Sequence, residues 1–228
     1  MNGNFDWRKM SCVLIITGCV QFIIVTFVAM FFYKGGTYIN PNSSGYIFCF
    51  NYFSDLGRTV AHSGIANKIS FILFTVTFTL WGILQIPFYF VFPTFFKDSI
   101  KFKKFSKIGS IFGCVSGVFY VGVAFTPSDI MSYFHNIFVV ISFSSIYFSL
   151  IVYAIVIFRS KFYPNFYALI LLISVIIISI YFIFLGLFAN GLSSIDLLIY
   201  VVGQKVMIYT LLINGIIQGC GALRQLAP

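Results

Sequence analysis

The sequence contains few charged residues and no glutamate. Charged residues make up 8% of the 228 positions, and the five acids are all aspartates. Water-soluble domains usually carry about 25% charged residues, so the composition excludes an ordinary soluble domain. The chain is instead 60% hydrophobic and 21% aromatic. Since so apolar a chain could not cover its surface with polar groups in water, we expect an integral membrane protein.

Sequence motifs of common catalytic and metal sites are also missing. The chain has no Gly-x-Ser-x-Gly, no His-Glu-x-x-His and no phosphate-binding glycine loop. The five cysteines match no zinc-binding spacing, and only Cys49 falls in a polar loop. Neither a zinc site nor a disulfide framework is therefore expected. We predict that the protein uses no cofactor and no bound metal.

Long apolar runs make up most of the chain. A transmembrane helix needs about 20 apolar residues, and the sequence has six runs near that length. The predicted fold is all-α, an integral membrane bundle of six transmembrane helices that forms a single domain over residues 1–228. The expected spans are 11–33, 69–92, 108–125, 134–158, 166–188 and 197–217, and the longest connection is an outer loop over 34–68.

The basic residues indicate how such a bundle is oriented. If both termini are cytoplasmic, ten lysines and arginines fall on inner segments and four fall elsewhere. Inner loops of membrane proteins are enriched in these residues, so both ends are expected in the cytoplasm. Such loops meet anionic headgroups, and the charge of +9 therefore favours membrane lipids as partners, not nucleic acid. The expected location is the cell membrane, as a multi-pass protein.

The most polar stretch of the outer loop runs from Asn51 to His62. If this stretch is helical, Asp55, Arg58 and His62 are spaced by three and four residues and share one face. The stretch then places an acid, a base and an imidazole side by side at the membrane surface.

Other polar residues fall on the same side of the predicted bundle. Ser128 is expected to cap the fourth helix, with Asp129 in its first turn. His135 follows seven residues after Ser128, on the same helical face. The predicted outer polar cluster consists of Ser54, Asp55, Arg58, His62, Ser128, Asp129, His135, Gln204 and Lys205.

Lys205 lies inside the last predicted span, about 12 Å along the helix axis. A lysine near mid-bilayer costs at least about 2.5 kcal/mol unless it is paired, hydrated or neutral. Asp196 is excluded as its partner, because the spacing on one helix puts the two on opposite faces. We expect an ion pair with Asp55 or Asp129. The alternative is a neutral lysine bonded to carbonyl groups.

Three interpretations of the outer polar cluster are open. The first is an electrostatic latch that clamps the outer loop onto the bundle. The second is a recognition pocket for a lipid headgroup or a small polar ligand. The third is an active site with acid–base groups or metal ligands, although a metal site is weakly indicated without a compact ligand motif. The candidate catalytic residues are Asp55, His62, Asp129 and His135.

Three glycines recur at every fourth position of the third span, at Gly109, Gly113 and Gly117. Small residues at this spacing let a neighbouring helix approach closely. We therefore expect these glycines to serve helix packing, not catalysis.

Three segments of the chain resemble motifs of known membrane families: Phe53-Ser54-Asp55-Leu56-Gly57, Thr126-Pro127-Ser128-Asp129 with His135, and Gln204-Lys205. The resemblance extends over nearly the whole chain and rests on these short motifs. They resemble a six-span family, mostly from bacteria and archaea, that is catalogued as domain of unknown function 998. The layout is also similar to that of the damage-regulated autophagy modulator and Frag/Sfk-type membrane proteins. The first family implies no assigned activity. The second implies lipid handling, including lipid asymmetry and the remodelling of lipid anchors.

These observations predict a membrane protein that interacts with lipid or a small ligand through the outer polar cluster. The alternative is a membrane-embedded enzyme, a hydrolase or acyl transferase, that acts on lipid. A small-solute transporter is a third hypothesis. The sequence shows no internal repeat and no pair of matching broken spans, which argues against that third hypothesis.

Overall fold

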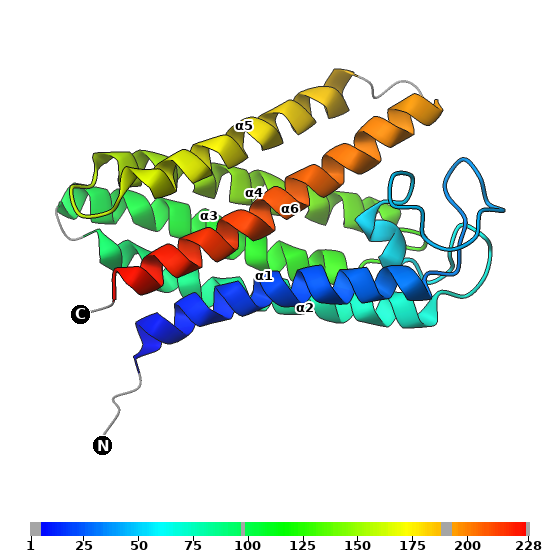
Figure 1. The fold of residues 1–228 in the computed structure, drawn as a ribbon, viewed down its shortest axis with the longest axis horizontal. Coiled ribbons are helices and arrows are strands. Elements are labelled where there is room, and N and C mark those ends of the chain that lie inside the picture. The colour runs from blue at the N-terminus through cyan, green and yellow to red at the C-terminus, as the bar shows by residue number, and fades with distance from the viewer. Residues whose placement is uncertain (1–5, 97–98, 188–192, 227–228) are drawn as a thin grey trace.

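The computed structural model describes residues 6–96, 99–187 and 193–226, and regular secondary structure in this part of the chain is helical (Figure 1). Six of its helices are long and apolar enough to cross a membrane, as the sequence predicts. The ends of the predicted domain and of the predicted fifth span, at residue 188, lie outside the described residues. The elements are α1 (Trp7–Phe32), η1 (Phe53–Gly57), α2 (Lys68–Val91), η2 (Phe92–Phe95), α3 (Ile100–Ala124), α4 (Ser132–Arg159), α5 (Asn165–Leu187) and α6 (Ser194–Arg224).

The helix bounds differ most from the predicted spans where charged residues continue a helix. The third span is expected to begin at residue 108, but α3 begins at Ile100. Lys101, Lys103 and Lys104 are exposed along this added part, while Ser106 is buried. The helix therefore continues beyond the apolar segment as an amphipathic turn, which a search for apolar runs cannot detect.

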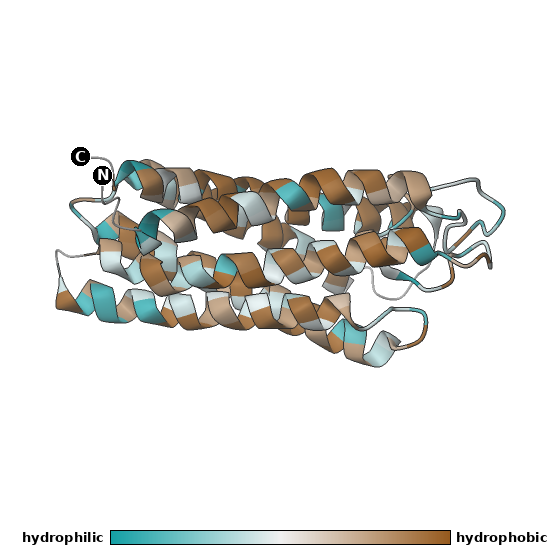
Figure 2. Ribbon diagram, turned by 90° about the horizontal axis from the view of Figure 1, so that it is seen from below, coloured by the Kyte–Doolittle hydropathy of each residue, from teal (hydrophilic) through white to brown (hydrophobic). Residues whose placement is uncertain are grey.

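The six helices form a closed ring. Each helix packs against the next one along the chain, and α6 returns to pack against α1. The chain enters α1 and leaves α6 at one end of the bundle, here called the terminus end (Figure 1). The long connection between α1 and α2 lies at the opposite end, here called the loop end. Figure 2 shows apolar residues along the middle of the helices and hydrophilic ones mainly near the two ends.

Aromatic rings fill the inside of the ring of helices. Phe22 of α1 packs edge-on against Phe78 and Trp81 of α2, with centroid distances of 5.0 and 4.9 Å. Trp81 in turn stacks on Tyr120 of α3 at 4.1 Å. Phe53 of the outer loop joins the same cluster, 5.8 Å from Phe22. The outer loop thus shares a core with the membrane helices.

The three glycines of α3 face two different neighbours. A Cβ on Gly109 would lie 3.0 Å from the Tyr153 ring of α4, and one on Gly113 would lie 2.5 Å from the Tyr89 ring of α2. Gly117 meets Gly82 of α2 backbone to backbone. A Cβ on either of these two would lie 2.7 Å or less from the carbonyl oxygen of the other. The helices α2 and α3 therefore cross with their backbones in close contact at this glycine pair.

This crossing leads to a first prediction. Gly82→Leu should lower the free energy of unfolding in detergent by about 1–3 kcal/mol, because backbone atoms cannot move aside as a side chain can. The matched control is Gly186→Leu in α5, where a Cβ meets nothing within 4 Å among the described residues. That change should alter stability by less than about 0.5 kcal/mol. Equal melting temperatures for the two variants would contradict the close crossing.

Candidate functional site

Residues 34–67, here called the lid, fold back on themselves at the loop end. Gly35 and Gly36 both have positive φ, of 89° and 80°. Gly36 N donates to Ser43 O at 2.8 Å, and Ser63 N donates to Gly35 O at 3.0 Å. A Cβ on Gly36 would lie 2.3 Å from Ser63 N. Only glycine therefore lets the two segments of the lid cross so closely.

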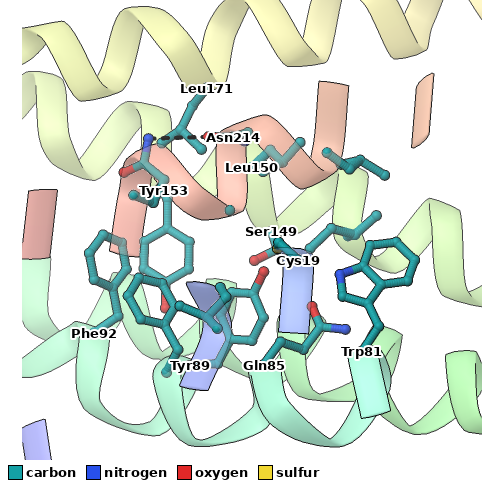
Figure 3. Close-up of a pocket in the computed structure, with 16 residues that line it drawn as sticks. Cys19, Trp81, Gln85, Tyr89, Phe92, Ser149, Leu150, Tyr153, Leu171 and Asn214 are labelled. Atoms are coloured by element: carbon teal, nitrogen blue, oxygen red, sulfur yellow. Dashed lines mark hydrogen bonds between the residues drawn. The ribbon is translucent and has the colours of Figure 1, made fainter. Parts of the chain in front are cut away.

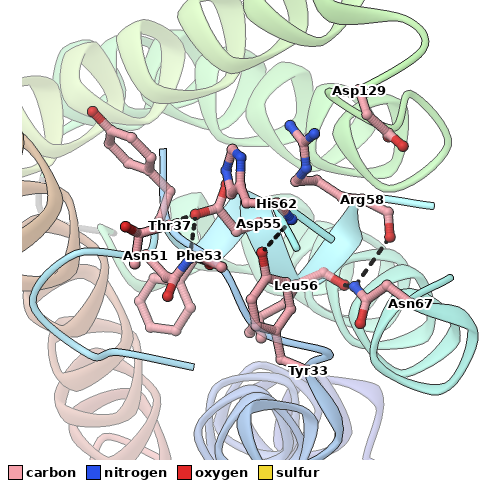
Figure 4. Close-up of polar contacts among 12 residues, drawn as sticks. Tyr33, Thr37, Asn51, Phe53, Asp55, Leu56, Arg58, His62, Asn67 and Asp129 are labelled. Atoms are coloured by element: carbon pink, nitrogen blue, oxygen red, sulfur yellow. Dashed lines mark hydrogen bonds and ion pairs between the residues drawn. The ribbon is translucent and has the colours of Figure 1, made fainter. Parts of the chain in front are cut away.

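Asp55 is the acid at the centre of the lid (Figure 4). It is 4% exposed. Its carboxylate accepts hydrogen bonds from Tyr52 N at 2.9 Å and from Asn51 Nδ2 at 3.1 Å. The His62 ring lies 3.1 Å from the other carboxylate oxygen. Three donors thus satisfy a carboxylate that is almost out of contact with solvent.

The predicted helical face of Asp55, Arg58 and His62 is wrong. The helix η1 ends at Gly57, and Arg58 already has extended backbone. Arg58 Nε donates to Val60 O at 3.1 Å, away from Asp55. His62 reaches Asp55 because the chain turns back after Arg58, not because of helical spacing. The sequence therefore identified the His62–Asp55 pair, but from a helical spacing that the structure does not have.

Asn51 connects the parts of the lid, and it is 0% exposed. Its Oδ1 accepts from Ile47 N at 2.9 Å, and its Nδ2 donates to Gly36 O at 2.9 Å as well as to Asp55. Its carbonyl oxygen accepts from Tyr46 Oη at 2.9 Å. Burial raises the pKa of Tyr46 well above its ordinary value, so the hydroxyl is a neutral donor.

Lys205 of α6 donates to that same Asn51 carbonyl oxygen, and its side chain is 1% exposed. Rings of Tyr46, Phe48 and Phe53 lie 5.4, 5.0 and 5.5 Å from its Nζ. Aromatic faces at such distances stabilise an ammonium group. Lys205 thereby joins α6 to the lid through a backbone carbonyl and a set of rings.

The expected ion pair of Lys205 with Asp55 or Asp129 is not formed. Among the described residues, the salt bridge present is that between His62 and Asp55. The reason is that both carboxylates are already occupied by donors from the lid. The observed contact is the carbonyl bond of the alternative prediction, and the neutral state of the lysine in that alternative stays a prediction.

Asp129 ties the lid to the turn between α3 and α4. Its carboxylate accepts from Thr59 N at 3.0 Å, Thr59 Oγ1 at 2.6 Å and Val60 N at 2.9 Å. Partial burial would raise the pKa of Asp129, but the hydrogen bonds from Thr59 and Val60 outweigh it and lower that pKa below its ordinary value.

The expected cap by Ser128 is wrong. The helix α4 begins at Ser132, its N-cap position is Met131, and no side chain caps it. Asp129 therefore lies before the helix, not in its first turn. Residues 127–131 form a turn in which Met131 N donates to Pro127 O at 2.8 Å. This turn leaves the Asp129 carboxylate free to bind the lid.

His135 and Gln204 also bind backbone groups. His135, 4% exposed, lies with Nδ1 2.6 Å from Thr126 O. A carbonyl oxygen only accepts, so the proton is on Nδ1. Gln204 Oε1 accepts from Phe53 N of the lid at 2.9 Å. Ser54 and Ser128 are half-buried, and neither side chain takes part in the network described above.

The chemistry of the cluster follows from these contacts. Most of its polar side chains hold the lid's backbone, as a latch would. Asp55 orients the His62 ring, an arrangement that acid–base catalysis also uses. Within the described residues, no three side chains of His, Cys, Asp or Glu converge as a metal site needs. Sequence analysis missed Asn51 and Tyr46 as organising residues, because isolated loop residues have no periodic pattern.

Two apolar grooves lie beside the cluster, within the membrane-spanning part. The first groove has a volume of about 280 Å³ and lies between α4, α5 and α6. It is lined by Val139, Val140, Phe143, Ser144, Tyr181, Phe182, Leu185, Gln204 and Met207. A second, of about 460 Å³, lies between α5 and α6. Tyr181 lines both grooves. A Cβ on Gly203 would lie 2.7 Å from its ring. The first groove, here called the lateral groove, reaches the lid through Gln204.

Comparison with protein-family models, with curated proteins and with solved structures found no match for this chain. The resemblance to the two membrane families therefore stays a prediction.

The lowered pKa of Asp129 leads to a second prediction. Because this pKa is lower in the folded than in the unfolded protein, its stabilisation is fully present above the ordinary aspartate pKa of about 3.9. It is lost as the pH falls through the lowered value. Melting temperatures measured from pH 7 down to pH 2.5 should fall more steeply for the wild type than for Asp129→Asn. Parallel curves would contradict a stabilising role for the ionised carboxylate.

The third prediction concerns Lys205. Lys205→Met and Asp129→Asn should each cost about 1.5–3 kcal/mol, the value of hydrogen bonds to charged groups. Their effects should add to within about 0.5 kcal/mol, because the two side chains share no partner. As a positive control, Lys205→Met and Tyr46→Phe should couple, since both donors bind Asn51 O. Thermal or denaturant unfolding of the singles and doubles would test this. A coupling energy between Lys205 and Asp129 above about 1 kcal/mol would contradict this prediction and support an ion pair between the two side chains.

Proposed function

We propose that this protein binds a membrane lipid in the lateral groove, with an acyl chain against α4, α5 and α6. The observation that carries the proposal is the position of the groove. It is apolar along its walls, it lies at membrane depth, and it ends at Gln204, which also holds the lid.

The surroundings of the groove support an acyl chain as the occupant. The helix α5 is the least buried of the six, with 22% of its span buried against 61% for α4. Figure 1 shows α5 and α6 slanting away from the other helices toward the loop end. Within the hydrocarbon region of a bilayer, lipid acyl chains surround the exposed faces of helices. An apolar groove there is open to them from the side.

Two polar side chains define where the polar neck of the lipid lies. Ser144 of α4 and Gln204 of α6 line the groove. Gln204 uses Oε1 for the lid, and its Nε2 is a donor that suits the ester carbonyl of a lipid. The binding site therefore combines apolar walls with a few placed polar groups, as ligand sites usually do.

The same proposal includes an orientation. The excess of lysine and arginine on the segments at the terminus end supports a cytoplasmic position for that end. The lid and the groove then belong to the outer half of the cell membrane. The lipid bound would be one of the outer leaflet.

A second candidate function is a membrane-embedded hydrolase or acyl transferase that acts on the bound lipid. The contact between His62 and Asp55 favours it, because a carboxylate that orients an imidazole is a common element of acid–base catalysis.

The fourth prediction tests both candidates in one experiment. The protein is reconstituted in nanodiscs with phosphatidylcholine that carries a diazirine on its acyl chain, and is then irradiated. Ser144→Phe should fill the groove and reduce cross-linking to α4, α5 and α6 at least about fivefold, since added ring volume excludes the chain. The control is Val118→Phe, at an exposed position of α3 that does not line the lateral groove. This variant should cross-link like the wild type.

Equal cross-linking of Ser144→Phe and the wild type would contradict the lipid site. The lipid recovered from the nanodiscs also tests the second candidate. Intact lipid after long incubation supports a binding role. A cleaved or transferred acyl chain that disappears in His62→Gln, while the melting temperature is retained, supports the enzyme.

A further inference from the structure

A pocket of about 360 Å³ lies at the terminus end of the bundle, opposite to the lid. The residues that line it come from α1, η2, the turn between α4 and α5, and the end of α6: Arg8, Phe95, Phe162 and Gln225. None of them belongs to the outer polar cluster or to the lateral groove. The pocket therefore has a chemistry of its own.

Arg8 is the charged group of this pocket, and it forms no ion pair among the described residues. Its guanidinium carbon lies 4.7 Å from the centre of the Phe95 ring. Its Nε is enclosed by the protein and has no acceptor. The terminal nitrogens Nη1 and Nη2 are not enclosed in this way, and no described residue accepts a hydrogen bond from them. These two nitrogens are the donors that a ligand in the pocket can use.

The Phe95 ring that carries the guanidinium group is fixed by the core. Phe95 is 8% exposed, and its ring centroid lies 5.9 Å from that of Phe92. Phe92 in turn packs edge-on against Tyr153 of α4 at 4.7 Å, inside the bundle (Figure 3). Packed rings thus hold the surface on which Arg8 lies. A group that is held in place before a ligand arrives loses less entropy on binding.

The surroundings of the pocket carry a large excess of positive charge. In the described part of the chain, Asp6 is the one acid at the terminus end. Its Oδ1 accepts from Arg8 N at 2.9 Å and from Lys9 N at 3.4 Å, so this oxygen caps α1. The described basic residues at the same end are Arg8, Lys9, Lys101, Lys103, Lys104, Lys107, Arg159, Lys161 and Arg224. Their summed field attracts an anion to this end of the bundle.

The shape of the guanidinium group and the depth of the pocket define which anion fits. The planar fork of arginine matches the oxygens of a phosphate group. Phe162, which lines the pocket, is 69% exposed, and Trp7, next to Arg8 in the chain, is 51% exposed. Exposed aromatic rings at the ends of membrane helices lie at the level of the lipid headgroups. The phosphate groups of phospholipids lie at that same level.

We propose that this pocket is a phosphate-binding site, in which Nη1 and Nη2 of Arg8 bind the phosphate of a phospholipid or of a soluble phosphate compound. The Gln225 amide is an uncharged donor on the wall of the same pocket. The site lies at the opposite end of the bundle from the lid, and it does not depend on the proposed lipid binding in the lateral groove.

Two matched charge removals test the site. Arg8→Gln and Lys9→Gln each remove one positive charge from the first turn of α1, but Lys9 is exposed and does not line the pocket. The purified protein in a nonionic detergent is titrated with dioctanoyl phosphatidylglycerol and, separately, with inorganic phosphate at constant ionic strength. A ligand that binds the folded protein raises the melting temperature, and the concentration dependence gives the affinity.

Arg8→Gln should weaken the affinity for at least one probe about tenfold or more, the factor that losing one hydrogen bond between charged groups gives. Lys9→Gln should weaken it less than about twofold, because an exposed charge contributes little. Arg8→Lys keeps the charge but lacks the planar fork. It should also weaken binding more than Lys9→Gln does, and this variant decides the question if Arg8→Gln does not fold. A lipid in the lateral groove would stay bound in all three variants and does not affect the comparison.

The two probes distinguish the source of the phosphate group. Binding of phosphatidylglycerol alone that depends on Arg8 supports a lipid phosphate as the ligand. Binding of inorganic phosphate that depends on Arg8 supports a site for a soluble phosphate compound. Equal weakening by Arg8→Gln and Lys9→Gln would mean a general attraction to the basic surface and would overturn the proposal. The absence of a wild-type response to both probes would overturn it as well.

Discussion

The hydrogen bonds that converge on Asn51 hold the loop end together. Its carbonyl oxygen receives donors from Tyr46 and Lys205, and its amide joins Gly36 to Asp55. Near the hydrocarbon of a bilayer, polar backbone groups must find partners inside the protein. An irregular lid can lie against α6 only if each such group is paired. Asn51 supplies several of these pairs at one point and connects the lid to α6.

Two of the few acids in this chain have a structural role at the loop end. Asp55 and Asp129 are each in contact with three donors of the lid, of which one at Asp55 and two at Asp129 are backbone N–H groups. A carboxylate satisfied in this way stabilises a loop, but it has few lone pairs left for a substrate or a metal. His62 is the exception, since its ring is only partly buried and keeps one nitrogen outside the contact with Asp55. Holding the lid therefore accounts for most of the contacts that these two carboxylates make.

The helices could be predicted from the sequence, but the contacts of the site could not. In a bilayer a long apolar segment satisfies its backbone hydrogen bonds as a helix. The six apolar runs were therefore sufficient to predict the six helices. The sequence also predicted how far Lys205 lies along α6 and which face of that helix it occupies. These two predictions implied that Lys205 needs a polar partner. They could not identify a backbone carbonyl as that partner, because any loop residue offers one. Ser128 failed as a cap for a related reason, since the turn before α4 is shaped by its contact with the lid.

Gln204 belongs to both the lid and the lateral groove, and this shared position has a thermodynamic consequence. Its Oε1 accepts from Phe53 N, and the same side chain lines the groove. A lipid that bonds to the amide nitrogen would polarise the amide and strengthen the bond to the lid. Coupling between two sites is reciprocal, so a lid that is docked on Gln204 would also favour the lipid. The buried ring of Phe53, packed on Phe22, fixes the lid end of this connection. The lid and the groove would thus respond to lipid as one unit.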